Sequence, residues 1–276
     1  MDASKKVAIA RWNGAFESLQ DIVAVEEPLE IRLGYVSVRG RKQQSVSITM
    51  RTPGDDFSLA AGFLFSEGIL RHPEDIKEIV WCGDGANQNV VRVELADHVK
   101  PDLKRLQRHI YTTSSCDVCG KTSLEALELQ GWAVVTSEAR VSAAVLVELP
   151  DVLRASQAVF EKTGGLHAVG EFSAAGGLLN HREDVGRHNA LDKLLGHHVQ
   201  NGRDSFQGDI LVLSGRASFE LIQKAIAARC PIVAAVGAPS SLAVELAKEY
   251  GITLAGFVRG GTMNIYAHPH RIVPGT

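Results

Sequence analysis

The first hundred residues alternate between apolar and polar positions in four short stretches, which is the pattern of half-buried β-strands. Residues 29–40 and 43–54 form one pair, and the polar bend across residues 38–44 would make them antiparallel neighbours. Residues 76–83 and 89–96 form a second pair around a polar turn. The pattern predicts strand pairs throughout this part of the chain.

A helical period interrupts these strands. Apolar residues recur at helical spacing between residues 56 and 70, and Asp56 or Ser58 would cap this helix. Residues 102–110 form a second, shorter amphipathic pattern. We therefore expect residues 1–110 to form a small α+β domain.

The C-terminal part has a different pattern, in which continuous apolar runs alternate with helical patterns. The apolar runs cover residues 209–216, 231–239 and 252–260, and the helical patterns cover residues 218–230 and 241–251. Continuous apolar strands that alternate with helices indicate a buried, mostly parallel sheet. The fold class is therefore expected to be α/β.

Three further elements precede these strands. Residues 151–165 are expected to form a helix that ends at glycines, residues 166–184 a hairpin, and residues 186–199 a second helix. The second helix and the residues before it hold many charged and polar side chains, among them Asp184 and His188. We interpret these side chains as a solvated helix face with local ion pairs. The alternative is a polar site formed by His188 and Asn189 near the start of the helix.

Composition and charge narrow the function. The chain of 276 residues carries a formal net charge of −3, which gives no electrostatic reason to expect nucleic acid or a membrane surface as the partner. It holds no apolar run long enough to span a bilayer, and its N-terminus does not read as a secretion signal. Four cysteines in a chain of this length do not make a disulfide framework. We expect a cytoplasmic protein with reduced thiols.

Two loops that follow the predicted parallel strands combine glycine with arginine. Ligands of open α/β sheets bind beyond the carboxyl ends of the strands, where glycine admits a close approach and arginine pairs with phosphate oxygens. One such loop would be ordinary turn chemistry with a solvated arginine, but two on one sheet edge favour an anionic ligand. Neither loop is a dinucleotide fingerprint or a Walker A motif, so a standard NAD or ATP site is not expected. The residues are Ser214, Gly215 and Arg216 in the first loop, and Arg259, Gly260 and Gly261 in the second.

Cys116 and Cys119 form a lone C-x-x-C pair in the polar stretch of residues 111–123, which we expect to be a mobile surface loop. A structural zinc site needs four ligands, and this pair has no second pair at a workable spacing. A deaminase-type zinc site needs H-x-E before P-C-x-x-C, whereas His167 and Glu171 have the wrong spacing and follow the cysteines. A thioredoxin-like pair would lie at a strand-to-helix turn. These comparisons favour a reactive thiol without zinc.

The surroundings of the pair favour a thiolate. Lys121 is near, and a helix is expected to begin at residue 123. A positive charge and a helix N-terminus both stabilise a thiolate, and a loop position suits a group that visits more than one site. If Cys116 carried a persulfide, Cys119 could attack it and release sulfide. The sulfur would therefore have to be handed on quickly, or Cys119 held out of line.

Several longer motifs occur in order along the chain. They read SSCDVCGK, TGGLHAVGEF, REDVGRHNALDKLLG, SGRASFELIQKA, GAPSSLAVELAKEYGITLAGFVRG and MNIY, and the helix AAGFLFSEGIL precedes them. From about Glu26 onward the sequence resembles the formate dehydrogenase accessory sulfurtransferase family, FdhD. Several long motifs in order are far more specific than any one of them.

The resemblance implies a sulfurtransferase that works as a sulfur carrier. A cysteine desulfurase would load a persulfide onto Cys116. The protein would pass this sulfur to the molybdenum of a bis(molybdopterin guanine dinucleotide) cofactor destined for formate dehydrogenase. The family pattern leaves open whether Cys119 carries sulfur, resolves the persulfide or only supports it. The assembly implied is a homodimer.

The resemblance also implies a fold and a cofactor-binding segment. Residues 124–276 would form a cytidine-deaminase-like three-layer α/β/α domain without zinc, beside the smaller α+β domain. The cofactor would contact residues 257–262, and GDP, which is a fragment of the cofactor, should bind as a probe. This segment comprises Phe257, Val258, Arg259, Gly260, Gly261 and Thr262.

Two other functions stay open at this point. The protein could be a chaperone that binds the molybdenum cofactor without covalent sulfur transfer, or a zinc-free relative of deaminases with an unknown nucleotide ligand. A sulfur carrier gains the mass of sulfur from a desulfurase and cysteine, whereas a pure chaperone does not.

Overall fold

A computed structural model describes residues 2–83, 88–102, 131–206 and 208–275. The predicted C-x-x-C loop lies outside these residues. So do the helices predicted on either side of the loop, apart from residue 102.

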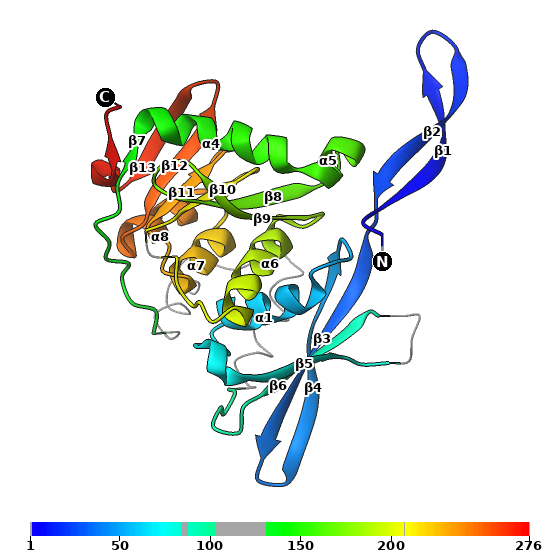
Figure 1. The fold of residues 1–276 in the computed structure, drawn as a ribbon, viewed down its shortest axis with the longest axis vertical. Helices are drawn as coiled ribbons and strands as arrows, with labels where there is room; N and C mark the ends of the chain where they lie inside the picture. Colours follow the sequence, from blue (N-terminus) through cyan, green and yellow to red (C-terminus); the bar gives the residue numbers. More distant parts are fainter. Residues whose placement is uncertain (1, 84–87, 103–130, 207, 276) are drawn as a thin grey trace.

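A six-stranded sheet forms the centre of the C-terminal part (Figure 1). Its strands are β8 (His167–Phe172), β9 (Leu178–Asp184), β10 (Ile210–Leu213), β11 (Ile232–Ala235), β12 (Thr253–Arg259) and β13 (Thr262–Ala267). The strand order is β13-β12-β11-β10-β8-β9. β10, β11 and β12 run parallel, and the other three each run antiparallel to a neighbour. The three predicted parallel strands and the predicted hairpin β8–β9 are thus confirmed.

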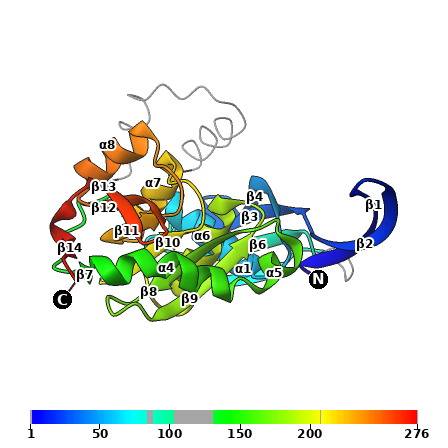
Figure 2. The same ribbon diagram turned by 90° about the horizontal axis from the view of Figure 1, so that it is seen from above.

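Helices cover both faces of this sheet (Figures 1 and 2). They are α4 (Ala143–Ser156), α5 (Ala158–Thr163), α6 (Arg187–Gln200), α7 (Phe219–Ala227) and α8 (Ser241–Glu249). Leu146, Leu149 and Leu153 of α4 pack on one face in a small apolar core. Helices α6, α7 and α8 contribute to a second, larger core on the other face. The mixed α/β class is confirmed, and the cytidine-deaminase-like architecture stays a prediction.

The N-terminal part contains a four-stranded sheet with the order β4-β3-β6-β5. Its elements are β3 (Glu27–Ser37), β4 (Gly40–Arg51), helix α1 (Asp56–Ser66), the single turn η1 (Pro73–Asp75), β5 (Ile76–Trp81) and β6 (Val90–Leu95). Both predicted strand pairs are confirmed, and the parallel pairing of β3 with β6 joins them into one sheet. Near the C-terminus, β14 (Ile272–Val273) follows the turn η2 (Pro269–Arg271) and pairs with β7 (Val141–Ser142).

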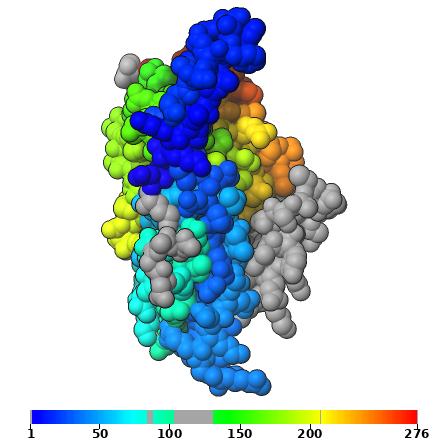
Figure 3. Space-filling view, turned by 90° about the vertical axis from the view of Figure 1, so that its right-hand side faces the viewer, coloured from blue at the N-terminus to red at the C-terminus, as the bar shows by residue number. Residues whose placement is uncertain are grey.

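A projecting hairpin precedes the N-terminal sheet, and the sequence analysis did not predict it. Its strands are β1 (Ser4–Trp12) and β2 (Phe16–Ala24), and they form a separate two-stranded sheet. The hairpin stands away from the body of the molecule (Figures 1 and 2), and it forms the upper end of the molecule in the space-filling view (Figure 3). At its tip the rings of Trp12 and Phe16 lie 5.0 Å apart and are 64% and 78% exposed. Most of its side chains are exposed, so no clear apolar face marks it in the sequence.

The predicted caps of α1 are wrong, because both side chains bind elsewhere. The residue at the N-cap is Asp55, in a left-handed conformation and without a side-chain capping bond. The carboxylate of Asp56 accepts a hydrogen bond of 2.6 Å from the fully buried guanidinium of Arg51. The hydroxyl of Ser58 accepts one of 2.8 Å from the side chain of Gln200.

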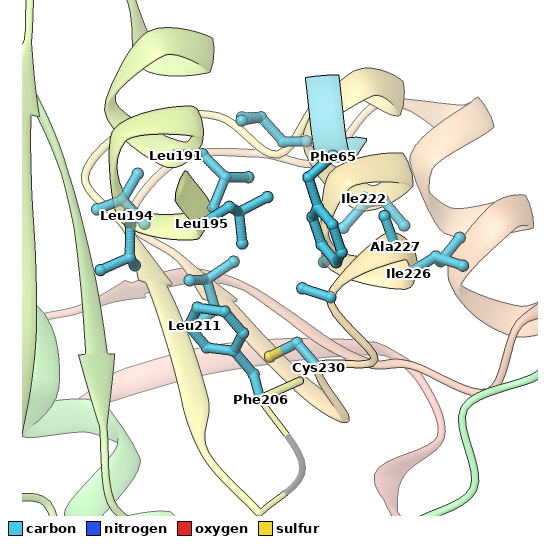
Figure 4. Packing of buried hydrophobic residues seen from close by; sticks show 14 of the residues in the cluster. Phe65, Leu191, Leu194, Leu195, Phe206, Leu211, Ile222, Ile226, Ala227 and Cys230 are labelled. Carbon is cyan, nitrogen blue, oxygen red and sulfur yellow. The ribbon is translucent and has the colours of Figure 1, made fainter. Parts of the chain in front are cut away.

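The N-terminal and C-terminal sheets are joined by α1 and α6, which cross at two glycines. A Cβ on Gly62 would collide with the backbone of Asp192, and a Cβ on Gly196 would collide with the carbonyl of Ser58. Glycine at both positions therefore lets the two helices touch backbone to backbone. One apolar cluster runs from the N-terminal sheet through this crossing into the C-terminal sheet. Figure 4 shows Phe65 of α1 among side chains of α6 and α7.

Helix α4 begins earlier than predicted. We expected a helix over residues 151–165 that ends at glycines. The structure instead places Pro150 inside α4 and divides the predicted span at Gln157, between α4 and α5. The buried leucines of α4 recur at helical spacing on both sides of the proline, so packing against the sheet outweighs the backbone hydrogen bond that proline removes.

Asp184, Asn189, Asp192, Lys193 and His198, before and within α6, are buried, so the prediction of a solvated face is wrong for these side chains. Asp184 is fully buried, and its carboxylate lies 2.7 Å from Lys193 Nζ and accepts a bond of 3.1 Å from the amide of Thr52. Asp192 and Lys224 form a second buried pair at 2.8 Å. The partners come from the end of β4 and from α7, which are distant in sequence.

Candidate anion-binding site

The carboxyl ends of the three parallel strands lie on one edge of the C-terminal sheet. The loops that leave these ends touch through their backbones. The amide of Gly237 donates to the carbonyl of Gly215 at 2.9 Å, and the amide of Phe257 donates to the carbonyl of Gly237 at 3.1 Å. Ser214 and Gly215 therefore lie one loop away from Phe257, as predicted for a shared sheet edge.

Glycine is required where these loops pack. A Cβ on Gly237 would lie 3.0 Å from Cγ of Arg216, and a Cβ on Gly256 would lie 2.9 Å from Cδ of Pro239. Contacts this short would force the loops apart. The glycines therefore let the three loops pack closely on one edge of the sheet.

The segment of residues 257–262 is a β-hairpin rather than a strand-to-helix loop like the one after β10. Phe257 and Val258 lie in β12, and Gly260 and Gly261 form the turn into β13 with φ of 57° and 73°. Arg259 is exposed next to this turn, with its guanidinium 5.8 Å from the Phe257 ring centroid. Its carbonyl accepts a 3.1 Å bond from the hydroxyl of Thr262. The second of the two predicted glycine–arginine loops is therefore the turn of a hairpin.

Four basic side chains gather at this edge. Of these, the sequence analysis named Arg216 as a candidate and left a polar site at His188 as an alternative. Arg216 comes from the loop after β10, His167 from the start of β8, and Arg187 and His188 from the start of α6. Burial and the charges of Arg187, His188 and Arg216 lower the pKa of His167 below its ordinary value. We call these four residues the basic cluster.

The antiparallel pairing of β8 with β10 explains why His167 belongs to the basic cluster. The start of β8 lies beside the end of β10, where Ser214 and Ala168 exchange hydrogen bonds of 2.8 and 3.0 Å. In register, His167 pairs with Asp184 at the end of β9, directly before α6. His167 joins the basic cluster only because β8 pairs with β10 and β9 in this register. A local sequence motif carries no information about that pairing, so it could not identify the cluster.

Polar contacts hold His188 and leave part of Arg187 unsatisfied. His188 Nε2 lies 3.1 Å from Ser218 Oγ and 3.6 Å from a carboxylate oxygen of Glu220. Nε of Arg187 is buried and has no hydrogen-bond partner among the described residues. A buried guanidinium N–H without a partner is a donor that an anion would satisfy.

The end of β4 fixes the start of α6. The hydroxyl of Thr52 accepts a 3.2 Å bond from the amide of Val185, and the side chain of Asn189 donates to the carbonyl of Met50 at 2.7 Å. Asp184 accepts from the amide of Gly186 at 2.8 Å. Arg187 and His188 follow directly, so the N-terminal sheet positions two members of the basic cluster.

The chemistry that this edge supports is the binding of an anion. The helices α6 and α7 both begin here, and the N–H groups of a helix N-terminus together with its dipole favour negative charge. Two arginines and two histidines surround them. The carboxyl edge of an open α/β sheet is also where ligands of such folds bind.

Two clefts of about 350 Å³ each occur elsewhere, lined by residues of the N-terminal part that lie between positions 67 and 102 and between positions 54 and 88. We place the candidate site at the sheet edge, because the basic cluster and the helix N-termini converge there.

The described cysteines are not candidates for sulfur chemistry. Cys230 is buried among apolar side chains (Figure 4), and burial raises the pKa of its thiol to about 12. Cys82 is half-buried beyond the end of β5. Cys116 and Cys119 lie outside the described residues. Within the described ranges no three His, Cys, Asp or Glu side chains gather closely enough to bind a metal ion.

Among the helices of the described part of the chain, none is both long and apolar enough to cross a membrane.

Comparison with known proteins yields one consistent family. The sequence profile of the FdhD/NarQ family matches residues 24–273. The chain is 52% identical over 268 residues to a protein of Streptomyces coelicolor named sulfur carrier protein FdhD, covering 94% of this chain and 92% of that one. A protein of the same name from Sulfolobus acidocaldarius is 40% identical over 269 residues, covering 97% and 98%.

A solved structure resembles this fold throughout. It is described as a "putative formate dehydrogenase accessory protein" from Desulfotalea psychrophila, and it covers 99% of this chain and 100% of its own with a TM-score of 0.76. Its sequence identity of 24% means that this likeness concerns the fold.

Proposed function

The chain belongs to the FdhD/NarQ family, and on this basis we propose that it is a sulfur carrier needed for formate dehydrogenase activity. In the proposed reaction the thiolate of Cys116 attacks the terminal sulfur of a persulfide on a cysteine desulfurase. The desulfurase thiolate leaves, and Cys116 carries the sulfur. The acceptor is the molybdenum of a bis(molybdopterin guanine dinucleotide) cofactor, which binds as a substrate. The names of the similar proteins and the C-x-x-C motif support this proposal.

The single observation that carries the cofactor part of the proposal is the basic cluster at the sheet edge. A guanine dinucleotide contains a diphosphate group, which is the kind of anion that arginine forks and helix N-termini bind. Arg216 projects beside Gly237, and Phe257 follows one loop away. The cofactor would therefore lie along the loops after β10, β11 and β12, with its diphosphate near Arg216 and α6.

GDP titration tests the proposed cofactor site. Loss of a charge-assisted contact costs about 1.5–3 kcal/mol, so Arg216→Ala should weaken GDP binding by roughly ten- to a hundredfold. Arg259→Ala should also weaken it, if residues 257–262 contact the nucleotide. Cys116→Ala should bind GDP like the wild type, because the thiol acts at the metal end of the cofactor. The cofactor site would lie elsewhere if both arginine variants bound GDP unchanged in calorimetry.

The sulfur-carrying step has its own test, which does not depend on GDP. After incubation with a desulfurase and cysteine, intact mass spectrometry should show added sulfur on the wild type and none on Cys116→Ala. The Cys119→Ala variant shows whether the second thiol resolves the persulfide, because its loss would then increase the persulfide yield. Formate dehydrogenase from a strain carrying only Cys116→Ala should be inactive.

The alternative is a cofactor-binding chaperone without covalent sulfur transfer. The basic cluster favours it as much as it favours a carrier, because anion binding needs no thiol. Wild-type protein that binds GDP but gains no sulfur would establish the chaperone. For the carrier we further propose a cytoplasmic homodimer with formate dehydrogenase as the recipient of the loaded cofactor.

A further inference from the structure

One carboxylate lies at the solvent side of the basic cluster. Glu220 is in the first turn of α7, and its side chain is 56% exposed. A carboxylate oxygen of Glu220 lies 3.6 Å from Nε2 of His188, which also contacts Ser218 at 3.1 Å. An internal anion thus occupies the place where the basic cluster meets a helix N-terminus.

The donors around Glu220 are those that a bound phosphate would use. Interactions with His188, with its own backbone amide and with Ser218 lower the pKa of Glu220 to about 2, although burial opposes them. The N-cap residue Ser218 makes no side-chain cap to α7, and its hydroxyl lies 3.1 Å from Nε2 of His188, so an anion at this end of the helix would meet the hydroxyl and the imidazole together. The carboxylate and a phosphate would therefore compete for the same donors.

The other carboxylates near His188 cannot be displaced by a bound phosphate. Asp184 is fully buried with Lys193 at 2.7 Å, and Asp192 is buried with Lys224 at 2.8 Å. Each already has a cationic partner in the protein interior, so neither can leave its site without exposing an unpaired charge. Glu220 is exposed and can move into solvent.

From this geometry we propose that Glu220 is the internal counter-ion of the anion site, displaced by a phosphate group of the ligand. This inference rests on the anion site of the proposed function and adds a selection device to it. An incoming anion gains His188 and the start of α7 only by removing the carboxylate. A small monovalent anion cannot replace all of these contacts, whereas a diphosphate also engages the arginines. The carboxylate therefore favours multivalent phosphate ligands over common small anions.

Replacing Glu220 by glutamine tests this inference. Glu220→Gln keeps the size of the side chain and removes the competing charge. Because the interaction is partly exposed, we expect GDP and inorganic pyrophosphate to bind about two- to fivefold more tightly at constant ionic strength, measured by calorimetry. Inorganic phosphate should also compete more effectively against GDP. Glu220→Asp keeps the charge, and its affinity should stay near that of the wild type.

A matched control removes the same charge at a distant point. Glu249 is exposed and is the last residue of α8, so it lies beside the amino ends of the strands and away from the anion site. Glu249→Gln makes the same change in net charge and should leave the affinities unchanged. An equal gain in Glu249→Gln would mean that net charge, and not displacement, controls binding, and it would overturn the inference.

The outcomes separate this inference from the proposed function. If the wild type binds GDP and Glu220→Gln binds it equally or more weakly, the cofactor site stands and the counter-ion role is wrong. If no protein binds GDP but Glu220→Gln binds pyrophosphate more tightly than the wild type, the counter-ion role stands and the cofactor site is wrong. If neither protein binds either anion, the inference is overturned.

Discussion

The two ends of α6 each carry a histidine–glutamate pair, and the surroundings of the two pairs are opposite. At the start of the helix, His188 and Glu220 lie 3.6 Å apart with side chains that are 35% and 56% exposed. At its end, His198 and Glu171 lie 2.6 Å apart with side chains that are 7% and 0% exposed. Helix α6 therefore supplies the histidine of a partly exposed pair at one end and the histidine of a buried pair at the other, with the glutamates on α7 and β8.

This difference in burial indicates which of the two ion pairs can be broken by an incoming ion. Glu171 also has Arg203 within 3.3 Å, and the ring of His198 lies edge-on to Phe206 at 4.5 Å. Removing one member of a buried pair leaves an uncompensated charge, whereas an exposed pair is readily replaced by water or by another ion. The buried pair therefore stabilises the fold, and the exposed pair is suited to ligand exchange.

The largest expected effect is at the buried pair. Glu171→Ala removes the carboxylate beside His198 and should lower the free energy of unfolding by about 3–5 kcal/mol. Denaturant titration measures this change.

A double variant distinguishes destabilisation by an unpaired buried charge from destabilisation by the cavity that alanine leaves. Glu171→Met combined with His198→Leu replaces both members by apolar side chains, which is often neutral or stabilising for a buried pair. The double variant should recover most of the stability lost in Glu171→Ala. Equal instability of the two proteins would contradict the assignment of a buried ion pair.

A smaller effect is expected from pH. Burial alone would raise the pKa of Glu171, but the hydrogen bond and charge of His198 hold it below the ordinary value of 4.5. A carboxyl group with a lowered pKa in the folded state contributes stability above its unfolded pKa and loses it as the pH falls. The difference in stability between the wild type and Glu171→Gln should be complete at pH 7 and should shrink below about pH 4.5. A difference that grew on acidification would mean that the folded-state pKa is raised.

The smallest effect on stability is expected at the exposed pair. Glu220→Ala should change the free energy of unfolding by about 0–1 kcal/mol, because solvent screens the interaction. The same denaturant titration provides the measurement. A loss comparable to that of Glu171→Ala would remove the distinction between the two ends of α6.

Strands and helices with a strong period were predictable from the sequence, and elements without one were not. The apolar runs of β10, β11 and β12 identified the central parallel strands. The hairpin β1–β2 escaped prediction because its side chains are mostly exposed. The helix predicted from residue 151 begins earlier, because α4 continues through Pro150. The local sequence pattern therefore does not predict elements whose extent is determined by tertiary packing.

The candidate site was predictable only in part for a related reason. Ser214, Gly215 and Arg216 were found because they follow one strand directly. His167, Arg187 and His188 join them only through the antiparallel pairing of β8 and the docking of α6. The cysteine pair and the family were found from local motifs, which need no knowledge of the fold.

The burial of polar residues was the second feature that could not be predicted from the sequence. The polar residues of α6 have a spacing that suits a solvated face and a buried network equally well. The partners that decide between them, Thr52 and Lys224, lie on other elements. Charge pattern along one helix cannot identify such partners, so the surroundings of the buried pairs became clear only in the structure.

The glycine crossing of α1 and α6 sets a delay during biosynthesis. About 130 residues separate Gly62 from Gly196, so α1 leaves the ribosome long before the helix that covers it. At about 5–20 residues per second, that interval lasts roughly 7–26 seconds. During this interval the apolar side chains of α1 and of the N-terminal sheet stay exposed, because α6 has not yet been synthesised. Nascent chains of this protein are therefore expected to need a holding chaperone until translation has passed residue 200.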